Sequence, residues 1–559
     1  MNWKWAVLGS VMLAAQSLAA DWQWSTPVAP KATTQPTKEV PRAFLWIPPD
    51  CKRVRGVVFG HHNMEEEPIL EHPAFRKALA EIGFAEVWVA PAFDQFFRFD
   101  VDAEKRFESM MTALADESGY EELARAPLVP VGHSAAASMP WVMAAWKPQR
   151  VIAGVSFSGQ WPYVWDDKNM PQVAGRSLDA VPGIVTIGEY EWAGENIPKG
   201  LPIRKDHPQL PLSAVGCPAD GHFAATDEKV ELLALYVKKA AHYRLGANWP
   251  ELNAIDPTKT GWLIDRYRPN QDPTAPAAPV GDYKGDPAQA FWFFDGEIAK
   301  AAEAFQQKHR GKAVLLGYVQ DGEVLPQKNG THQQVTIPFK PLEDGVTFNL
   351  AGAFLDTVPE GRPERWTGKK AGGAIEKPAG GPPIAIDRIT GPIRKVSDDT
   401  WTLAFNRASF LGDRRGNEAW LVATWPGDGP YKRMVQQSQL RIPGRNKDGA
   451  PQKIDFPQPP NVTAATREIR LVAKSDSGMP VRFYVREGPA EIDGNTLRLT
   501  AIPPRAKFPV AVTVVAWQFG RSTDPTVQSA EPVTRSFYLA DGKTPVPTAD
   551  PAAATEAGR

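Results

Sequence analysis

The residues with the clearest chemical potential are the tetrapeptide Gly132-His133-Ser134-Ala135 and the apolar run at 126–131 that precedes it. The run predicts a short strand, the tetrapeptide a sharp turn, and residues 138–146 a helix that ends before Pro148. A serine at such a turn stands above the edge of a sheet, and the backbone N–H that follows it can face a developing oxyanion. The pattern therefore favours Ser134 as a nucleophile, with a serine that caps a helix as the alternative.

A nucleophilic serine needs a base, and the base needs a carboxylate that orients it. The apolar runs at 181–188 and 211–215 predict two further strands. Glu189 and Glu191 directly follow the first of these strands, and His222 follows the second. Because catalytic groups collect at the carboxyl edge of a parallel sheet, we expect the serine, a glutamate and the histidine to meet there.

Residues 56–59 predict one more strand, which ends in Gly60-His61-His62-Asn63. A second oxyanion donor is expected in this loop, so we predict that the N–H of Ala135 and a backbone N–H in the His62-Asn63 turn hold the oxyanion. The adjacent histidines and the glutamates at 65–67 also allow a metal site, but the segment contains neither H-x-H nor H-E-x-x-H. We therefore expect neither a metal nor a cofactor.

Together these motifs resemble the α/β-hydrolase fold family, and within it secreted esterases with a G-H-S nucleophile turn. The resemblance covers residues 40–244 and implies Ser134 as nucleophile and His222 as base. Two positions depart from the family pattern. His62 replaces a glycine that is common in the oxyanion loop, and Ala136 replaces the second glycine of the serine turn.

Three carboxylates compete for the role of triad acid. Glu189 and Glu191 stand two positions apart and can face the same side of the chain, so alternation does not separate them. Asp220 is only two residues from His222, which is too close along the chain to aim at the imidazole ring. In the hydrolases that this chain resembles, the acid commonly stands three residues after the glycine that ends the strand, and this implies Glu191.

The chain has 559 residues, enough for two to four domains, and a formal net charge of −1, which gives no reason to expect nucleic acid as a partner. We predict a signal peptide at 1–20, an α/β-hydrolase domain with a mostly parallel, doubly wound sheet at 21–250, a linker and middle β-rich domain at 251–460, an immunoglobulin-like β-sandwich at 461–541 and a disordered tail at 542–559. Within the middle domain, residues 361–383 are expected to form a loop. The protein is therefore expected to be secreted or periplasmic, without membrane insertion.

The chain contains two cysteines, Cys51 and Cys217, in a compartment that would permit a disulfide. Cys51 is expected before the strand at 56–59, and Cys217 after the strand at 211–215. These two points lie at opposite ends of the proposed sheet. We therefore expect both thiols to be unpaired.

These inferences favour a serine hydrolase, most of all a carboxylic ester hydrolase that uses a Ser-His-Glu triad. Four aromatic residues near the site in sequence make an esterified carbohydrate one candidate substrate, beside other esters and amides. They are Trp161, Tyr163, Trp165 and Trp192. The alternative is a non-catalytic or adhesive cell-surface binding protein on a hydrolase scaffold. The sequence does not give the oligomeric state.

Overall fold

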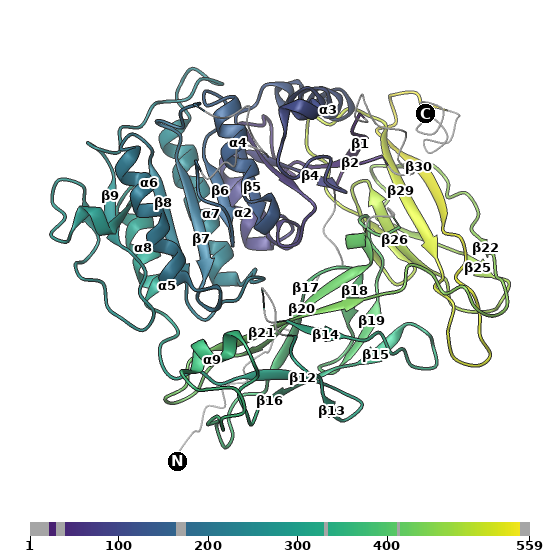
Figure 1. The fold of residues 1–559 in the computed structure, drawn as a ribbon. Coiled ribbons are helices and arrows are strands. Elements are labelled where there is room, and N and C mark those ends of the chain that lie inside the picture. Colours follow the sequence, from purple (N-terminus) through teal and green to yellow (C-terminus); the bar gives the residue numbers. More distant parts are fainter. Residues whose placement is uncertain are drawn as a thin grey trace, which may run out of the picture.

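The computed structural model of the protein describes residues 22–29, 40–163, 175–328, 332, 334–410 and 414–547. The predicted signal peptide and residues 548–559 of the predicted tail lie outside this part. The described chain forms a mixed α/β region followed by two β-rich regions (Figure 1). None of the described helices is long and apolar enough to cross a membrane.

An eight-stranded sheet organises the first region, with the strand order β1-β2-β4-β3-β5-β6-β7-β8. Strands β3 to β8 are parallel to one another, whereas β2 runs antiparallel to both of its neighbours, β1 and β4. The strands are β1 (Trp24–Pro27), β2 (Arg42–Trp46), β3 (Gly56–His61), β4 (Phe84–Ala90), β5 (Leu128–His133), β6 (Gly154–Phe157), β7 (Gly183–Gly188) and β8 (Leu212–Cys217). The parallel strands are buried along their whole length, as in sheets that are covered on both faces.

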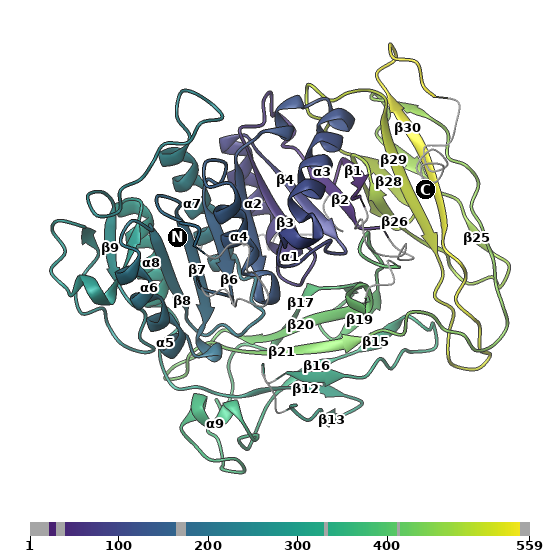
Figure 2. The ribbon, with the colours of Figure 1, turned by 45° about the horizontal axis from the view of Figure 1, so that its top comes forward.

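Helices provide that cover on the two faces of the sheet (Figure 2). Helix α3 (Ala103–Ser118) packs with α4 (Met139–Trp146), and α2 (Pro73–Ile82) packs with α7 (Asp227–Arg244). Local chemistry sets the ends of α2, because the ring of His72 accepts the N–H of Ala74 and Gly83 closes the helix at φ +69°. This mostly parallel, helix-covered sheet confirms the predicted fold class of the N-terminal region.

The core of this region continues past residue 250, where the sequence placed a domain boundary. Strands β9 (Trp262–Asp265) and β11 (Ala290–Phe293) and helix α8 (Gly296–Gln306) add buried residues to the core of the main sheet. The Ser213 hydroxyl of β8 donates to the carbonyl of Trp292, at 2.6 Å. The predicted boundary thus lies inside a continuous core, because the aromatic residues of this proline-rich stretch pack against the sheet.

Three small sheets share a second core in the middle region, and their strand orders are β14-β21-β20-β17, β13-β12-β16 and β15-β19-β18. The strands are β12 (Leu316–Gln320), β13 (Glu323–Val324), β14 (Val335–Ile337), β15 (Thr347–Asn349), β16 (Ala351–Phe354), β17 (Ala385–Thr390), β18 (Ile393–Lys395), β19 (Thr400–Leu403), β20 (Glu418–Trp425) and β21 (Met434–Arg441). The segment predicted as a loop contains helix α9 (Arg362–Thr367). The figures place this region against the carboxyl edge of the main sheet (Figures 1 and 2).

The last region consists of the sheets β23-β30-β29-β26 and β24-β28-β27, which enclose a third core. The strands are β23 (Val462–Thr463), β24 (Glu468–Arg470), β26 (Arg482–Glu487), β27 (Ala490–Asp493), β28 (Thr496–Leu499), β29 (Val510–Trp517) and β30 (Val533–Ala540). This region docks on the α/β region, where Arg505 pairs with Glu122 at 2.9 Å and the N–H of Lys507 donates to the carbonyl of Ser118.

Both cysteines are buried and free within the described part of the chain. Cys51 precedes β3, and Cys217 ends β8. Burial raises the pKa of the Cys217 thiol, so little of the reactive thiolate forms at neutral pH.

Candidate active site

Ser134 lies at the turn between β5 and α4, where its φ is +52°. A non-glycine residue with positive φ is strained, and such strain is typical of the nucleophile turn of hydrolases. The turn is also closely packed, since a Cβ on Gly132 would lie 2.1 Å from the carbonyl oxygen of Ala136. Glycine at position 132 is therefore needed to let the chain turn this sharply beneath the serine.

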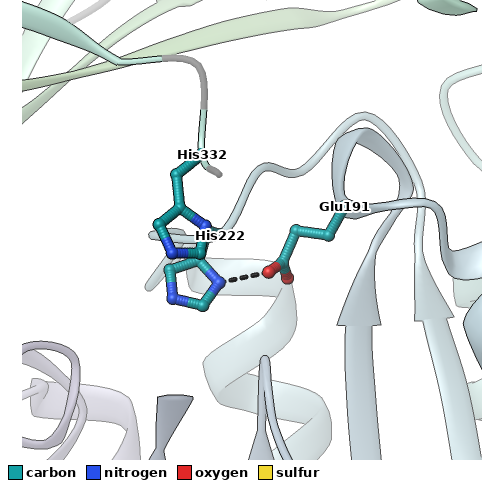
Figure 3. Close-up of side chains that lie close together, drawn as sticks. All are labelled: Glu191, His222 and His332. Carbon is teal, nitrogen blue, oxygen red and sulfur yellow. Dashed lines mark hydrogen bonds and ion pairs between the residues drawn. The ribbon is translucent and has the colours of Figure 1, made fainter. Parts of the chain in front are cut away.

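The structure brings Ser134, His222 and Glu191 together in one hydrogen-bonded chain. The Oγ of Ser134 lies 2.8 Å from Nε2 of His222. On the other side of the ring, Nδ1 of His222 is hydrogen bonded to a carboxylate oxygen of Glu191, which points at the imidazole from the turn after β7 (Figure 3). Three residues predicted from separate strand ends thus meet at the carboxyl edge of the sheet.

Glu191 is the acceptor at the end of this chain. Burial alone would raise the pKa of its carboxyl group, but the facing His222 ring and hydrogen bonds from His222 and Ser158 lower it to about 2. The N–H of Gly188 donates to the second oxygen at 3.3 Å. An ionised Glu191 can only accept, so it holds the proton of His222 on Nδ1 and leaves Nε2 as an acceptor for the serine hydroxyl.

The other two candidate acids face elsewhere. Glu189 accepts the N–H of Ala219 at 2.8 Å and forms an ion pair with Lys432. Asp220 forms an ion pair with Arg433, at 2.6 Å. Lys432 and Arg433 directly precede β21 of the middle region, so these two carboxylates help to dock that region beside the site.

The oxyanion loop after β3 differs in part from the expectation. The N–H of His62 donates to the carbonyl of Val89 at 2.7 Å, so it is engaged in the sheet. The backbone N–H groups of Asn63 and Ala135 have no hydrogen-bond partner among the described residues. The side-chain amide of Asn63 donates to the carbonyl of His133 at 2.6 Å and fixes the loop beside the serine strand. Within the His62-Asn63 turn, the unpaired donor is therefore Asn63.

Glu65 and Glu66 connect the loops that carry the site. Glu65 accepts the N–H of Ala224, two residues after His222, and pairs with Lys229 at 3.0 Å. The neighbouring Glu66 accepts the N–H of His133 at 2.7 Å, one residue before the serine. All three of these ionisable side chains are buried, and burial raises the pKa of Glu66 to about 7. The carboxylates that suggested a metal site thus hold the histidine loop and the serine turn.

Glu67 makes the corresponding connection to the middle region. It pairs with Arg388 at 3.1 Å, accepts the hydroxyl of Thr390 at 2.5 Å and accepts the amide of Asn406 at 3.2 Å. Burial raises the pKa of this carboxyl group, but the charge of Arg388 and these contacts outweigh burial and lower it. Glu67 is therefore an ionised anchor between the two regions.

The three other histidines near the site support the fold. His61 is fully buried among aromatic rings, and burial lowers its pKa to about 3. The ring of His62 packs edge-on against Trp88, with the ring centroids 5.3 Å apart. The ring of His133 donates from Nε2 to the carbonyl of His222 at 2.9 Å.

One group of side chains in the described part of the chain could hold a metal ion. Glu191, His222 and His332 offer ligand atoms within 4.8 Å of one another (Figure 3). Both ring nitrogens of His222 are already hydrogen bonded, however, one to Glu191 and one to Ser134. A metal would have to displace one of these partners. The arrangement therefore suits proton transfer between Ser134 and His222, with Glu191 orienting the ring.

Sequence reasoning missed the wall that the middle region adds to the site. His332 stacks on His222 with ring centroids 3.7 Å apart (Figure 3). Burial and the nearby His222 lower the pKa of His332 to about 3. Arg362 and Trp366 of α9 line a pocket beside the triad. No local motif surrounds any of these residues, so only the packing of the regions identifies them.

No family model matches the chain, and no curated protein matches it. Among solved structures, a dienelactone hydrolase from Anabaena variabilis is similar at 15% identity and a TM-score of 0.28, over 40% of this chain and 98% of that one. An esterase from Pyrobaculum calidifontis is similar at 17% identity and a TM-score of 0.27, over 39% of this chain and 85% of that one. A siderophore hydrolase from Aspergillus nidulans is similar at 9% identity and a TM-score of 0.30, over 43% of this chain and 99% of that one.

Similarity at this level identifies neither a substrate nor an activity. The strand order, the mostly parallel sheet and the strained serine turn are properties of this chain itself. By these properties, its N-terminal region has the α/β-hydrolase fold.

The buried pair of Glu65 and Lys229 gives the first prediction. Glu65→Gln leaves the ammonium group of Lys229 buried without its counter-ion, so we expect the free energy of unfolding to fall by about 3–5 kcal/mol. The double variant Glu65→Gln/Lys229→Met should lose less, because no unpaired charge remains. Urea denaturation followed by tryptophan fluorescence measures both variants. A single variant as stable as the wild type would contradict the role of this pair.

Proposed function

We propose that the protein is a serine hydrolase that cleaves carboxylic esters with Ser134, His222 and Glu191. The hydrogen-bonded chain from Glu191 through His222 to Ser134 is the observation that carries this proposal. His222 takes the serine proton at Nε2 as Oγ attacks the ester carbonyl, and later returns it to the leaving alcohol. Glu191 keeps the imidazole oriented and stabilises the imidazolium that forms between these steps.

The oxyanion of the tetrahedral intermediate would be held by the N–H groups of Ala135 and Asn63. Both donors lack a partner among the described residues, and Asn63 is fixed beside the serine strand through its amide. Donors held in place before the reaction need no rearrangement as charge develops, and one such donor is worth about 10²–10³ in turnover. Unpaired, fixed N–H groups on two sides of Ser134 support this assignment.

A non-catalytic binding protein is the second candidate. A scaffold that has lost its activity has no need for a strained serine or for an ionised, buried glutamate aimed at a histidine. The strain at Ser134 costs stability, and strain of this kind persists mainly where it serves a function. The presence of both features supports the hydrolase.

The aromatic residues behind the carbohydrate-ester prediction do not form a stacking platform in the described part of the chain. Trp161 is buried against Phe291, and Tyr163 stacks on His207 with ring centroids 3.7 Å apart. Trp192 lies beneath the guanidinium groups of two arginines of α9, and Trp165 lies outside the described residues. An esterified carbohydrate thus stays a prediction from sequence.

We also propose that the protein acts in the periplasm or outside the cell. Residues 1–20 combine Lys4, an apolar stretch and small residues at their end, as signal peptides do. Mass spectrometry of the protein from medium or periplasm should find a chain that begins near residue 21. A cytoplasmic protein that keeps its leader would contradict this proposal.

The nucleophile can be tested directly with a fluorophosphonate probe, which reacts with activated serines. We expect one labelled site in the wild-type protein and none in Ser134→Ala. Ser138→Ala is the matched control, because Ser138 lies at the start of α4 and outside the hydrogen-bonded chain. Turnover of a short-chain aryl ester should follow the labelling. Folded wild-type protein that neither labels nor turns over esters would favour the binding protein.

The triad acid can be tested with two neighbouring variants. Glu191→Gln should lower turnover on the order of 10³–10⁴-fold, as an Asp→Asn change does in a serine protease triad. Glu189→Gln should change turnover per folded molecule far less, because Glu189 pairs with Lys432 and does not contact His222. Because the pKa of Glu191 is about 2, protonation of this carboxylate should not lower wild-type activity above about pH 3. A large loss in Glu189→Gln with normal Glu191→Gln would reverse the assignment.

A further inference from the structure

A pocket with about 270 Å³ of empty space opens beside the acid and the base of the triad. Glu191 and His222 form one side of it, while His332, Arg362 and Trp366 of the middle region form another. Because the acid and the base of the triad form part of its wall, a substrate held at Ser134 lies next to this pocket. The chemistry of its wall therefore bears on which esters reach the serine.

Arg362 is the most informative residue of this wall. Its side chain is half-buried, and it makes no hydrogen bond or ion pair with any described residue. The guanidinium carbon lies 3.7 Å from the centre of the Trp192 ring, so the flat face of the cation rests on the indole. Stacking of this kind uses the face and leaves the N–H edge of the guanidinium for a planar oxygen acceptor.

Further donors without partners lie close to Arg362. The indole N–H groups of Trp366, in the pocket wall, and of Trp192, beneath Arg362, are buried and have no hydrogen-bond partner. Nδ1 of His332 is also buried and unpaired, and it donates or accepts according to its tautomer. Buried polar groups are normally paired, so the open indole N–H of Trp366 in the pocket wall fits a missing acceptor. A cation and indole donors together match an anion better than a neutral or cationic group.

The other cations near the pocket already have carboxylate partners. These pairs are Lys432 with Glu189, Arg433 with Asp220 and Arg365 with Glu195. Glu191 attracts Arg362 at longer range, but its oxygens are taken by His222, Ser158 and Gly188. Within the described residues, Arg362 is thus the cation of the pocket wall that has no carboxylate within hydrogen-bond distance.

We propose that Arg362 binds a carboxylate of the substrate, so that the preferred substrates are esters that carry a negative charge near the scissile bond. The inference rests on the proposed ester hydrolysis and names the substrate class of that same site. The carboxylate could belong to the acyl part, as in a half-ester of a dicarboxylic acid, or to the alcohol part, as in an ester of a hydroxy acid. Both sources present the same planar group to the guanidinium edge.

Two pairs of substrates separate these sources. The acyl pair is 4-nitrophenyl hemiglutarate and 4-nitrophenyl pentanoate, and the alcohol pair is 3-acetoxybenzoate and 3-methylphenyl acetate. We expect kcat/KM to be at least tenfold higher for the anionic member of one pair. Arg362→Gln should lower kcat/KM for that ester by about 10–100-fold, mainly through KM, and leave its neutral counterpart nearly unchanged. Arg362→Lys should keep part of the preference.

Arg365→Gln is the matched control, because Arg365 is in the same helix, lies over the same Trp192 ring and pairs with Glu195. It should keep the preference for the charged ester. A second readout avoids turnover: glutarate should slow fluorophosphonate labelling of Ser134 in the wild type and in Arg365→Gln, but not in Arg362→Gln. Neutral-ester turnover shows that each variant is folded.

Two results would overturn the proposal while ester hydrolysis stands. The first is a wild-type enzyme that hydrolyses charged and neutral esters equally well. The second is an Arg362→Gln variant that loses kcat equally on both, which would mean that Arg362 acts through Glu191. Loss of both labelling and turnover in the wild type would instead refute the proposed hydrolase, and the carboxylate specificity with it.

Discussion

Three consecutive buried carboxylates, Glu65–Glu67, hold together the parts from which the site is built. Each one accepts hydrogen bonds from a different part: the segment after His222, the strand that ends just before Ser134, and the middle β-region. Removing such groups from water is costly, and only these charged and polar partners offset the cost. The positions of Ser134, His222 and the pocket wall are therefore linked through one short segment after β3.

Much of the catalytic framework is predictable from local sequence. The turn at Ser134 is recognisable because a buried strand, a glycine and small residues must coincide there, and α4 begins within a residue of the expected point. The ends of β7 and β8 follow from equally short apolar runs. Alternation could not separate Glu189 from Glu191, however. In the structure they differ because Lys432 and Ala219 engage the first, which leaves the second to face His222.

Contacts between distant segments account for what the sequence did not reveal. His332 and Arg362 lie more than a hundred residues beyond His222, and no spacing rule connects them to it. The core of the main sheet extends past the predicted boundary at residue 250 for a related reason. Prolines gave the following stretch the composition of a linker, but Trp292 and the aromatic residues beside it pack into the core of the main sheet.

The wall beside the triad comes from a region with a hydrophobic core of its own, whereas the serine, the histidine and the glutamate come from the main sheet. The proposed function thus assigns the reaction and the selection of the substrate to different structural units. Substitutions on α9 or at His332 would leave unchanged the strands that position the reacting groups. The architecture thus allows the substrate specificity to change without any change in the residues that carry out the reaction.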